Sequence, residues 1–277
     1  MSAQAGTMAS QVERAREFEA LHEAPGAFVI PNPYDPGSAV MLAQLGFKAL
    51  ATTSSGYAQT LGRLDGEISL DEKLEHCRAL CASVSIPVSA DLEHCYDDTP
   101  AGAAANLLRF AGTGLAGGSI EDYSRDGQIY PFELAVERVQ AAVEAVRTLD
   151  FPFVLTARAE GLLRRANTME EVIERLQAFE AAGADVLYAP GLTTLEDVRT
   201  VTSAVGKPVN VLAGGLPDAT VTELAEAGAK RISVGGALGR LVAAALAEAA
   251  REMRDEGGFS WLGRCASGRE LLGYLGR

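Results

Sequence analysis

Acidic residues follow directly after a short apolar run in residues 85–98, which read SIPVSADLEHCYDD. Asp91 and Glu93 lie two positions apart at the end of that run. If the strand continues through them, alternation places both carboxylates on the same face. Two like charges on one face repel each other unless a positive group lies between them. The segment therefore predicts a bound cation at the end of a strand.

Glu121 is a third carboxylate that follows a β-prone run. Neighbouring parallel strands lie about 5 Å apart, so Glu121 is expected close to Asp91 and Glu93. Three carboxylates repel one another in a partly desolvated site, and Mg²⁺ or Mn²⁺ relieves that repulsion because hard cations bind carboxylate and water oxygens. The alternative interpretation is that the three residues are helix caps and solvated loop charges.

Eight β-prone runs alternate with Ala, Leu and Glu-rich helical patterns, which predicts parallel βαβ units. The runs are residues 27–30, 49–53, 87–90, 118–120, 153–156, 186–188, 209–212 and 231–234. Ser69 and Thr168 each begin a capping-box pattern, and Asp35 is placed to cap a helix. Eight units predict an α/β protein with a (β/α)8 barrel fold and a single domain over residues 1–277. An open doubly wound sheet is the alternative, but the first strand is not followed by GxGxxG.

The carboxyl ends of barrel strands carry the catalytic groups, so polar residues at the predicted strand ends become candidates. Arg158 is a lone cation among acids at such a strand end, which makes it a candidate functional residue. The alternative interpretation is that it forms a structural ion pair. Tyr188 and Asn210 are candidate substrate contacts, and their alternatives are packing and turn formation.

Composition excludes several classes of function. There are 24 Lys and Arg residues against 37 Asp and Glu, a net charge of −13, which argues against binding to nucleic acid. No apolar run approaches the roughly 20 residues that span a bilayer, and no secretory signal begins the chain, so we expect a cytoplasmic protein without membrane partners. Four cysteines without CxxC and only three histidines favour a hard cation over zinc.

Four motifs together resemble the isocitrate lyase and phosphoenolpyruvate mutase (phosphonomutase) superfamily. They are TSSGY at 53–57 followed by Asp65, SADLE at 89–93, SIED at 119–122, and TAR at 156–158. The resemblance implies a Mg²⁺- or Mn²⁺-dependent barrel enzyme that acts on small 2-oxo or 2-hydroxy carboxylates. It also implies a homo-oligomer, a dimer or tetramer, in which a late helix is exchanged between subunits.

The same resemblance assigns roles to individual residues. Asp91, Glu93 and Glu121 match the metal-holding positions, and Asp91 also faces the substrate. Asp65 is a further acidic neighbour, and Arg158 is the cation beside the substrate. The substrate carboxylate is expected to contact Ser54, Ser55, Gly56 and Tyr57.

The segment after Asp122 departs from the superfamily pattern. Isocitrate lyases carry a Lys-Lys-Cys-Gly-His type loop there, whereas residues 123–131 read YSRDGQIYP and lack cysteine, lysine and histidine. Arg125, Asp126 and Tyr130 are candidate substitutes, with Gly127 as a hinge, and a solvated surface loop is the alternative. His94 and Cys95 are further candidates for acid or base, and a structural histidine and an inert buried thiol are the alternatives.

Three functions remain open at this point. The leading prediction is a carbon–carbon lyase that releases or binds a 2-oxo acid through a metal-stabilised enolate. The second is a phosphonomutase or phosphonopyruvate-type hydrolase that acts on a carbon–phosphorus bond. The third is a phosphate-binding barrel without turnover, suggested by the glycine pairs at 214–215 and 235–236 with Arg240 nearby.

Overall fold

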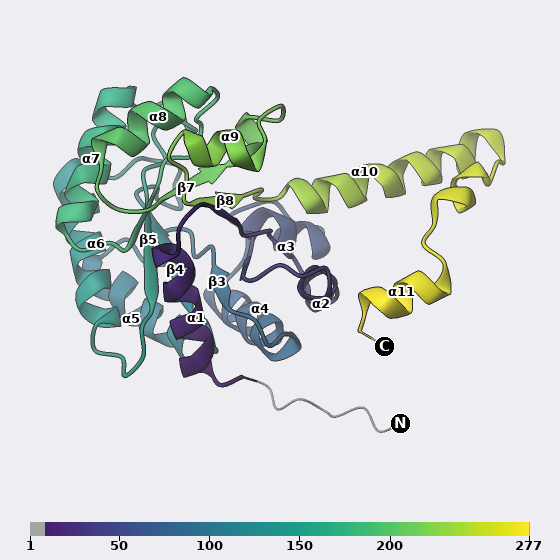
Figure 1. Cartoon of the computed structure of the whole chain (residues 1–277), viewed down its shortest axis with the longest axis horizontal. Helices are drawn as coiled ribbons and strands as arrows, with labels where there is room; N and C mark the ends of the chain where they lie inside the picture. The colour runs from purple at the N-terminus through teal and green to yellow at the C-terminus, as the bar shows by residue number, and fades with distance from the viewer. Residues whose placement is uncertain (1–8, 277) are drawn as a thin grey trace.

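The fold is a (β/α)8 barrel, as the sequence predicted (Figure 1). The computed structural model describes residues 9–276. All strand pairs are parallel and follow the order β1-β8-β7-β6-β5-β4-β3-β2, and Ala51 N–H donates to Pro31 O at 3.1 Å between the ends of β1 and β2. The strands are β1 (Phe28–Val29), β2 (Leu50–Ala51), β3 (Val88–Ala90), β4 (Gly117–Glu121), β5 (Val154–Arg158), β6 (Val186–Tyr188), β7 (Val209–Leu212) and β8 (Arg231–Ser233).

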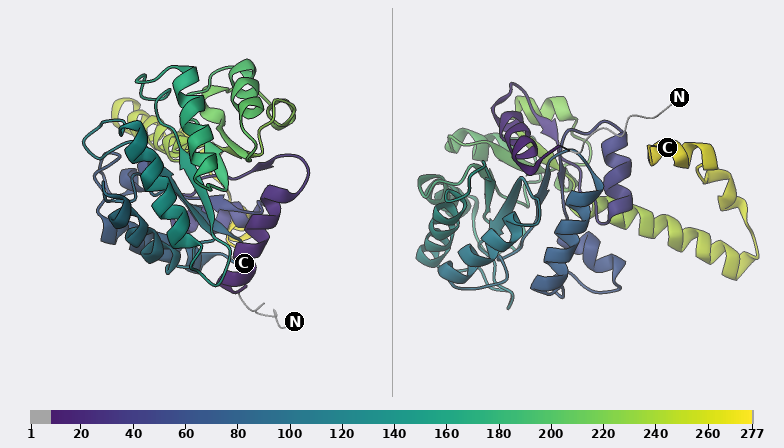
Figure 2. Two further views of the ribbon diagram at one scale, coloured as in Figure 1. Left: turned by 90° about the vertical axis from the view of Figure 1, so that its left-hand side faces the viewer. Right: turned by 90° about the horizontal axis from the view of Figure 1, so that it is seen from below.

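Helices cover the outside of the barrel, as the views in Figures 1 and 2 show. They are α1 (Gln11–Glu23), α2 (Pro36–Gln44), α3 (Ser54–Thr60), α4 (Leu70–Ser83), α5 (Pro100–Ala111), α6 (Phe132–Val146), α7 (Met169–Ala181), α8 (Leu195–Ala204), α9 (Val221–Glu226), α10 (Ala237–Arg251) and α11 (Gly268–Tyr274). The predicted capping boxes of Ser69 and Thr168 are present, and Asp35 caps α2. Each cap satisfies backbone N–H groups that the first helical turn leaves without partners.

The end of β3 matches the predicted run, whereas β4 and β5 are longer than predicted, and both facts decide how the acids are placed. β3 ends at Ala90, and Glu93 has a φ of +52°, so strand alternation does not govern Asp91 and Glu93. β4 and β5 instead extend to Glu121 and Arg158, which are register partners. These two side chains therefore lie side by side because of the sheet itself, whereas Asp91 and Glu93 depend on the loop after β3.

The amino end of the barrel is closed by apolar contacts that the sequence did not single out. Ala15 and Phe18 of α1 pack in one cluster with Val154 and Val186, the first residues of β5 and β6. Burying these apolar side chains stabilises the closed end. The carboxyl end is left for polar groups.

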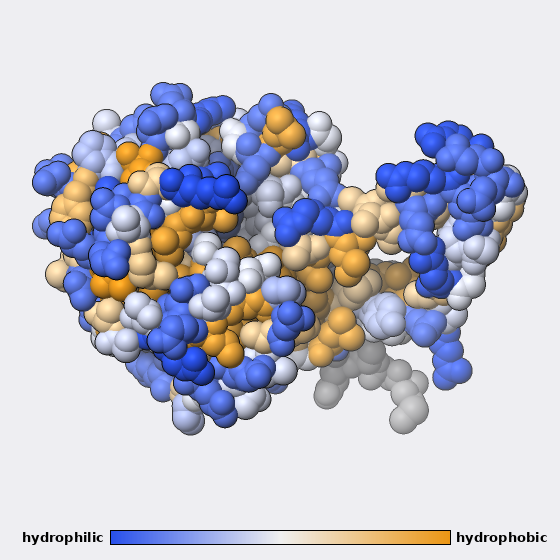
Figure 3. All heavy atoms as spheres, turned by 90° about the horizontal axis from the view of Figure 1, so that it is seen from above, coloured by the Kyte–Doolittle hydropathy of each residue, from blue (hydrophilic) through white to orange (hydrophobic). Residues whose placement is uncertain are grey.

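The last part of the chain leaves the barrel body. Figures 1 and 2 show α10 extending away from it, and Figure 3 shows the resulting arm standing apart. The chain then returns so that α11 packs beside α2. Leu241, Val242 and Leu246 of α10 are all more than half exposed. None of the helices in residues 9–276 has the length and apolar character needed to cross a membrane.

Candidate active site

A cavity of about 690 Å³ lies at the carboxyl ends of the strands. Its wall contains most of the side chains that the sequence singled out, namely Ser54, Ser55, Asp65, Asp91, Glu93, His94, Glu121, Arg125, Arg158, Tyr188 and Asn210. The structure thus brings together residues from seven segments of the chain. Gly56 and Tyr57 do not line this cavity.

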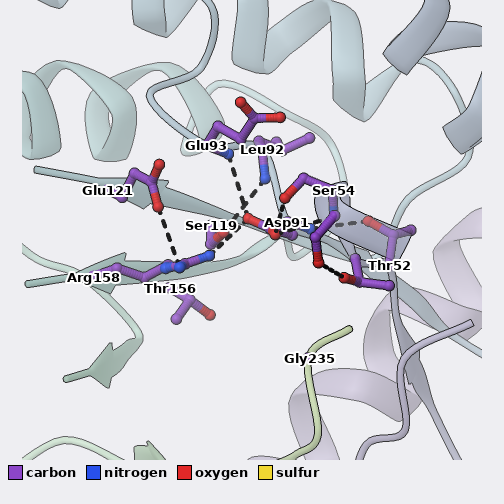
Figure 4. Close-up of polar contacts among 12 residues, drawn as sticks. Thr52, Ser54, Asp91, Leu92, Glu93, Ser119, Glu121, Thr156, Arg158 and Gly235 are labelled. Atoms are coloured by element: carbon purple, nitrogen blue, oxygen red, sulfur yellow. Dashed lines mark hydrogen bonds and ion pairs between the residues drawn. The ribbon is translucent and has the colours of Figure 1, made fainter. Parts of the chain in front are cut away.

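Arg158 lies among four carboxylates that we call the acid cluster: Asp91, Glu93, Glu121 and Glu160. Its Nη1 donates to Asp91 Oδ1 at 2.7 Å, and its Nη2 lies 2.8 Å from Glu160 Oε1 and 3.2 Å from Glu121 Oε2. Figure 4 shows the guanidinium directed at Asp91 and Glu121. One cation therefore serves three acids, each of them mostly or fully buried.

Asp91 is fixed by groups from three other elements. While Oδ1 accepts from Arg158, Oδ2 accepts from the Ser54 N–H at 3.3 Å and from its hydroxyl at 3.0 Å. The Asp91 N–H donates to Thr52 Oγ1 at 3.1 Å. Burial by itself raises the pKa of Asp91, but Arg158 and then Lys73 outweigh burial, so the net pKa is lowered. Asp91 is therefore ionised at neutral pH.

Glu93 is the acid of the cluster that forms no ion pair with Arg158. Its Oε1 accepts from the Tyr96 hydroxyl at 3.1 Å. Burial, followed by repulsion from Asp91, raises the pKa of Glu93 to about 7, although Lys73 opposes the change. Glu93 consequently changes charge near neutral pH.

Glu121 shares Arg158 with Asp91 and Glu160, which both lie closer to the guanidinium group. Its ion pair is the longest of the three, and burial together with repulsion from Glu160 and Asp91 raises its pKa well above the usual range despite Arg158. Burial disfavours a charged Arg158, but the carboxylates outweigh burial and raise its pKa. The arginine thus stays protonated, and the acids around it are incompletely neutralised.

Lys73 is a contributor that the sequence reasoning missed. It belongs to α4, is fully buried, and its Nζ donates to Thr52 Oγ1 at 3.3 Å. Its charge lowers the pKa of both Asp91 and Glu93. The spacing of residues in α4 could have predicted that Lys73 is buried, because Lys73 and Cys77 are four residues apart and share the buried face of the helix.

The charges of the cluster suit a hard divalent cation. Four carboxylates face three cations, Arg158, Lys73 and Arg164, whose Nε lies 3.6 Å from Glu160 Oε2, which leaves one surplus negative charge when every acid is ionised. In residues 9–276 no three His, Cys, Asp or Glu side chains already form a group that could hold a metal. Mg²⁺ does not need such a cage, because it binds through one or two carboxylates and keeps several waters. The residues therefore fit the ion, and the metal role of Asp91, Glu93 and Glu121 stays a prediction.

The segment that carries Glu93 has a constrained backbone. Glu93, Cys95 and Tyr96 all have φ between +52° and +59°, a left-handed conformation that costs free energy for residues other than glycine. Arg138, which is 1% exposed, holds this segment by donating to the His94 carbonyl at 2.6 Å. Such strain is typical of functional sites, where the surrounding structure enforces it.

His94 and Cys95 differ as acid and base candidates. Burial, followed by the charge of Arg138, lowers the pKa of His94, so its ring is neutral near pH 7. The ring also lines the cavity. Burial raises the pKa of the Cys95 thiol to about 12, and Cys95 does not line the cavity, so it is an inert core residue.

The loop at residues 122–131 forms a small hairpin at the cavity mouth. Tyr123 and Ile129 form an antiparallel bridge, and Gly127 has a φ of +82° in the turn between them. Asp122 anchors the hairpin by accepting from Arg175 at 3.2 Å and from the Glu160 N–H at 2.7 Å. Arg125 and Gly127 line the cavity, whereas Asp126 and Tyr130 do not.

The residues expected to grip the substrate carboxylate divide into two groups. The TSSGY segment forms the cap and the first turn of helix α3, and Ser54 and Ser55 line the cavity. Gly56 instead allows close packing, because a Cβ there would meet Thr53 Cγ2 at 2.6 Å. The Tyr57 ring stacks on His76 with the centroids 3.8 Å apart.

The glycine pairs expected to cradle phosphate also line the cavity. The N–H groups of Val234 and Gly235 already donate to Asn32 Oδ1 at 2.8 and 2.9 Å. Because Asn32 occupies these donors, they are not free for a phosphate. This observation removes the Gly235 N–H from the phosphate site that the third function would need.

The protein is a (β/α)8 barrel whose titratable groups gather at the carboxyl ends of the strands. Enzymes with this fold carry their catalytic groups at that end. The family model for phosphoenolpyruvate phosphomutase matches residues 18–254. The chain belongs to this family, which confirms the resemblance seen in the sequence. Proteins in the wider superfamily are lyases and mutases.

Three similar proteins illustrate the range. A crystal structure from Burkholderia cenocepacia J2315, described only broadly as a lyase or mutase, is 48% identical, covers 94% of this chain and 95% of its own, and has a TM-score of 0.90. Oxaloacetate decarboxylase of Paraburkholderia xenovorans is 32% identical over 67% of this chain and 63% of its own. Oxaloacetate acetylhydrolase, solved with its product oxalate, is 26% identical over 97% and 95% of the two chains, with a TM-score of 0.85.

The raised pKa of Glu93 makes stability depend on pH. From about pH 4.5 to 7 the folded protein keeps a proton that the unfolded chain releases, so the free energy of unfolding falls as pH rises through this window. Glu93→Gln removes this loss, and without divalent metal it should be more stable than the wild type at about pH 8 by about 1–3 kcal/mol. Urea unfolding across this range measures the difference. An unchanged pH slope in Glu93→Gln contradicts the assignment, and the exposed Glu75→Gln serves as the control.

Removing Arg158 should expose the mutual repulsion of the acids. In the absence of metal, Arg158→Leu is expected to lower the free energy of unfolding by about 3–5 kcal/mol, because buried carboxylates lose their partner. Added Mg²⁺ should restore part of that loss by supplying positive charge. Urea unfolding with and without Mg²⁺ tests both statements, with the exposed Arg199→Leu as control. Wild-type stability in metal-free Arg158→Leu would show that the acids do not depend on this cation.

Proposed function

We propose that this protein is a Mg²⁺- or Mn²⁺-dependent carbon–carbon lyase that acts on 2-oxo or 2-hydroxy (di)carboxylates through an enolate. The observation that carries the proposal is the surplus of buried carboxylates around Arg158 in a cavity of substrate size. The names of the oxaloacetate decarboxylase and the oxaloacetate acetylhydrolase support a small 2-oxo dicarboxylate as the substrate class.

Asp91, Glu93 and Glu121 would hold the metal, as their oxygen donors and surplus charge favour. When bound, Mg²⁺ supplies positive charge to the oxygens of a 2-oxo acid, where negative charge builds as an enolate forms. Arg158 supplies a second positive group, preorganised by its ion pairs with Asp91 and Glu160. These fixed charges stabilise the transition state more than the neutral ketone.

The remaining residues of the cavity wall position the substrate and move protons. Ser54 and Ser55 line the cavity from the start of α3, and Tyr188 and Asn210 line it from β6 and β7. His94 lines the cavity with a neutral ring and is the candidate proton acceptor. Asp65 and Arg125 line the mouth, where Asp65 adds to the repulsion that raises the pKa of Glu93.

A phosphonomutase or a hydrolase of phosphonopyruvate type is the second candidate, supported by the family model itself. Both reactions use the same metal and the same enolate, so the acid cluster does not separate them. The anchored hairpin at residues 122–131 lacks the Lys-Lys-Cys-Gly-His type motif that the resemblance associates with the lyases, and it lacks the lysine and asparagine that it associates with the phosphonate enzymes. Product analysis therefore has to distinguish them.

The proposal predicts stabilisation by small acids that depends on the metal. A set of 2-oxo, 2-hydroxy and phosphonate acids should raise the thermal midpoint only when Mg²⁺ or Mn²⁺ is present, because ligand binding stabilises the folded state by mass action. Acids that stabilise the protein are then tested for turnover. Release of a 2-oxo acid from a 2-hydroxy diacid supports the lyase, and release of phosphate or formation of a phosphonate supports the second candidate. Stabilisation by inorganic phosphate alone, without turnover, would instead indicate a binding barrel.

Asp91→Asn tests the metal role of Asp91 in this screen, because the substitution removes one charge with little change in shape. The variant should lose both the calorimetric heat of Mg²⁺ binding and the metal-dependent stabilisation by acids, while Asp71→Asn on the exposed surface keeps both. Unchanged Mg²⁺ affinity in Asp91→Asn would remove the metal role from this residue.

The proposed assembly is a homo-oligomer, a dimer or tetramer, in which the arm of one subunit packs on another. The arm stands apart from the barrel, and Val242 and Leu246 on one face of α10 are 54% and 69% exposed. Exposed apolar side chains in a contiguous row favour association. The exchange of α10 between subunits is part of this proposal.

Charges on that face should separate the subunits. In light scattering during gel filtration, the double variant Val242→Lys/Leu246→Lys is expected to elute as a monomer, since a buried lysine without a partner opposes association. Ala244→Lys, on another side of the same helix, should leave the wild-type mass unchanged. A monomeric wild type, or an oligomer that survives the double substitution, argues against this interface.

A further inference from the structure

Arg231 is a buried cation inside the barrel that the proposed chemistry leaves without a task. It is the first residue of β8, is 5% exposed, and lines the cavity. Barrel interiors are usually filled by branched apolar side chains. Here the buried positions on the strands include Ser89, Ser119, Thr156, Asn210 and Ser233. This polar interior surrounds a charge.

Two of the three nitrogens of Arg231 bond to neutral partners. Nε donates to Asn210 Oδ1 at 2.8 Å, and Nη2 donates to Thr156 Oγ1 at 3.0 Å. Nη1 is buried and has no hydrogen-bond partner. No carboxylate of residues 9–276 forms an ion pair with Arg231, in contrast to Arg158 and its three acids.

A buried guanidinium without a counter-charge is costly, so its retention calls for a compensating anion. Burial, with added repulsion from Arg158, lowers the pKa of Arg231 only to about 10, so the side chain is charged at neutral pH. A water molecule satisfies the N–H groups of Nη1 but leaves the charge uncompensated. A monoanion satisfies both.

The neighbours of Nη1 favour a carboxylate over a phosphonate. Arg231 offers one free nitrogen and one positive charge, which matches a monoanion. Ser233 Oγ accepts from Asn210 Nδ2 at 3.0 Å, and the Ser233 hydroxyl also bonds to the Tyr188 side chain, so Nη1 of Arg231 is the donor that this position offers. A dianionic phosphonate calls for more donors and charge than this position offers.

We infer that Arg231 forms an anion subsite deep in the cavity that binds the second carboxylate of a diacid substrate. The inference rests on the proposed function, because Arg158 and the acid cluster take the 2-oxo or 2-hydroxy end of the same molecule. It makes Arg231 the residue that distinguishes diacids from monoacids. The register between β7 and β8 fixes it opposite Asn210.

Matched acids with and without the second carboxylate provide the test. Calorimetry with Mg²⁺ compares lactate with malate and 2-hydroxyglutarate, and the wild type should bind the better diacid at least about tenfold more tightly than lactate. Arg231→Gln should lower that diacid affinity about tenfold to a hundredfold, as expected for one charged hydrogen bond, and leave lactate affinity unchanged. Equal loss of both acids, or a retained diacid preference, overturns the inference.

Asn210→Asp is the second variant and keeps Arg231 in place. The new carboxylate replaces the amide oxygen that already accepts from Nε and supplies the missing negative charge. The ratio of diacid affinity to lactate affinity should fall at least about tenfold, because the charge of Arg231 is now neutralised within the protein. Wild-type diacid preference in a folded Asn210→Asp overturns the inference. Arg78→Gln, exposed on the surface, is the control.

A bromide soak separates this inference from the proposed function. Crystals of the wild type should show an anomalous peak beside Arg231 Nη1, and Arg231→Gln crystals should lack it. If the wild type binds none of the three acids, the proposed function fails, and the peak alone then decides whether the anion site exists. Absence of the peak overturns the site. A peak combined with unchanged diacid preference in Arg231→Gln shows an adventitious ion only and overturns the substrate assignment.

Discussion

The shared ion pairs of Arg158 are the interaction on which the site depends. One guanidinium faces Asp91, Glu121 and Glu160 at 2.7 to 3.2 Å, in a setting where burial penalises every charge. Because the arginine cannot neutralise all of them, the pKa of Glu121 and that of Glu93 remain high. The site therefore favours the binding of an additional positive charge. An enzyme that must bind a cation and then stabilise an anion benefits from such an arrangement.

The register of the parallel sheet explains how polar residues from different strands come together in the cavity. Direct register partners run from Glu121 to Arg158, then to Tyr188, Asn210 and Arg231, so five neighbouring strands each contribute one polar side chain to a row that leads from the last residue of β4 to the first residue of β8. This belt connects the acid cluster to the buried cation of β8. The neutral Tyr188 and Asn210 lie between the two cations, and the Tyr188 ring packs against the Arg158 guanidinium at 5.0 Å. The belt thus offers two separate positions for negative charge.

The sequence could predict features that have local causes. The eight strands follow from short β-prone runs between helical patterns, and the caps at Asp35, Ser69 and Thr168 follow from local hydrogen bonding. That Glu121 and Arg158 lie close together could be predicted from the rule that the strand ends of a barrel form one site. The placement of Glu93 did not follow, because its left-handed backbone is imposed by contacts such as that between Arg138 and the His94 carbonyl. Residues 138 and 94 are too distant in the chain for a local pattern to reveal this.

The sequence by itself determined the alternation of strands and helices, the barrel, and the gathering of acids at one end, since each of these depends on periodicity and on the order of residues. Only the tertiary structure decided which charges are compensated. Nothing in the local sequence marks Lys73 or Arg231, yet both side chains are buried. Lys73 donates to Thr52, which also binds Asp91, whereas Arg231 lacks a counter-charge. Burial and long-range pairing set the cost of a charge, and neither is a property of neighbouring residues in the chain.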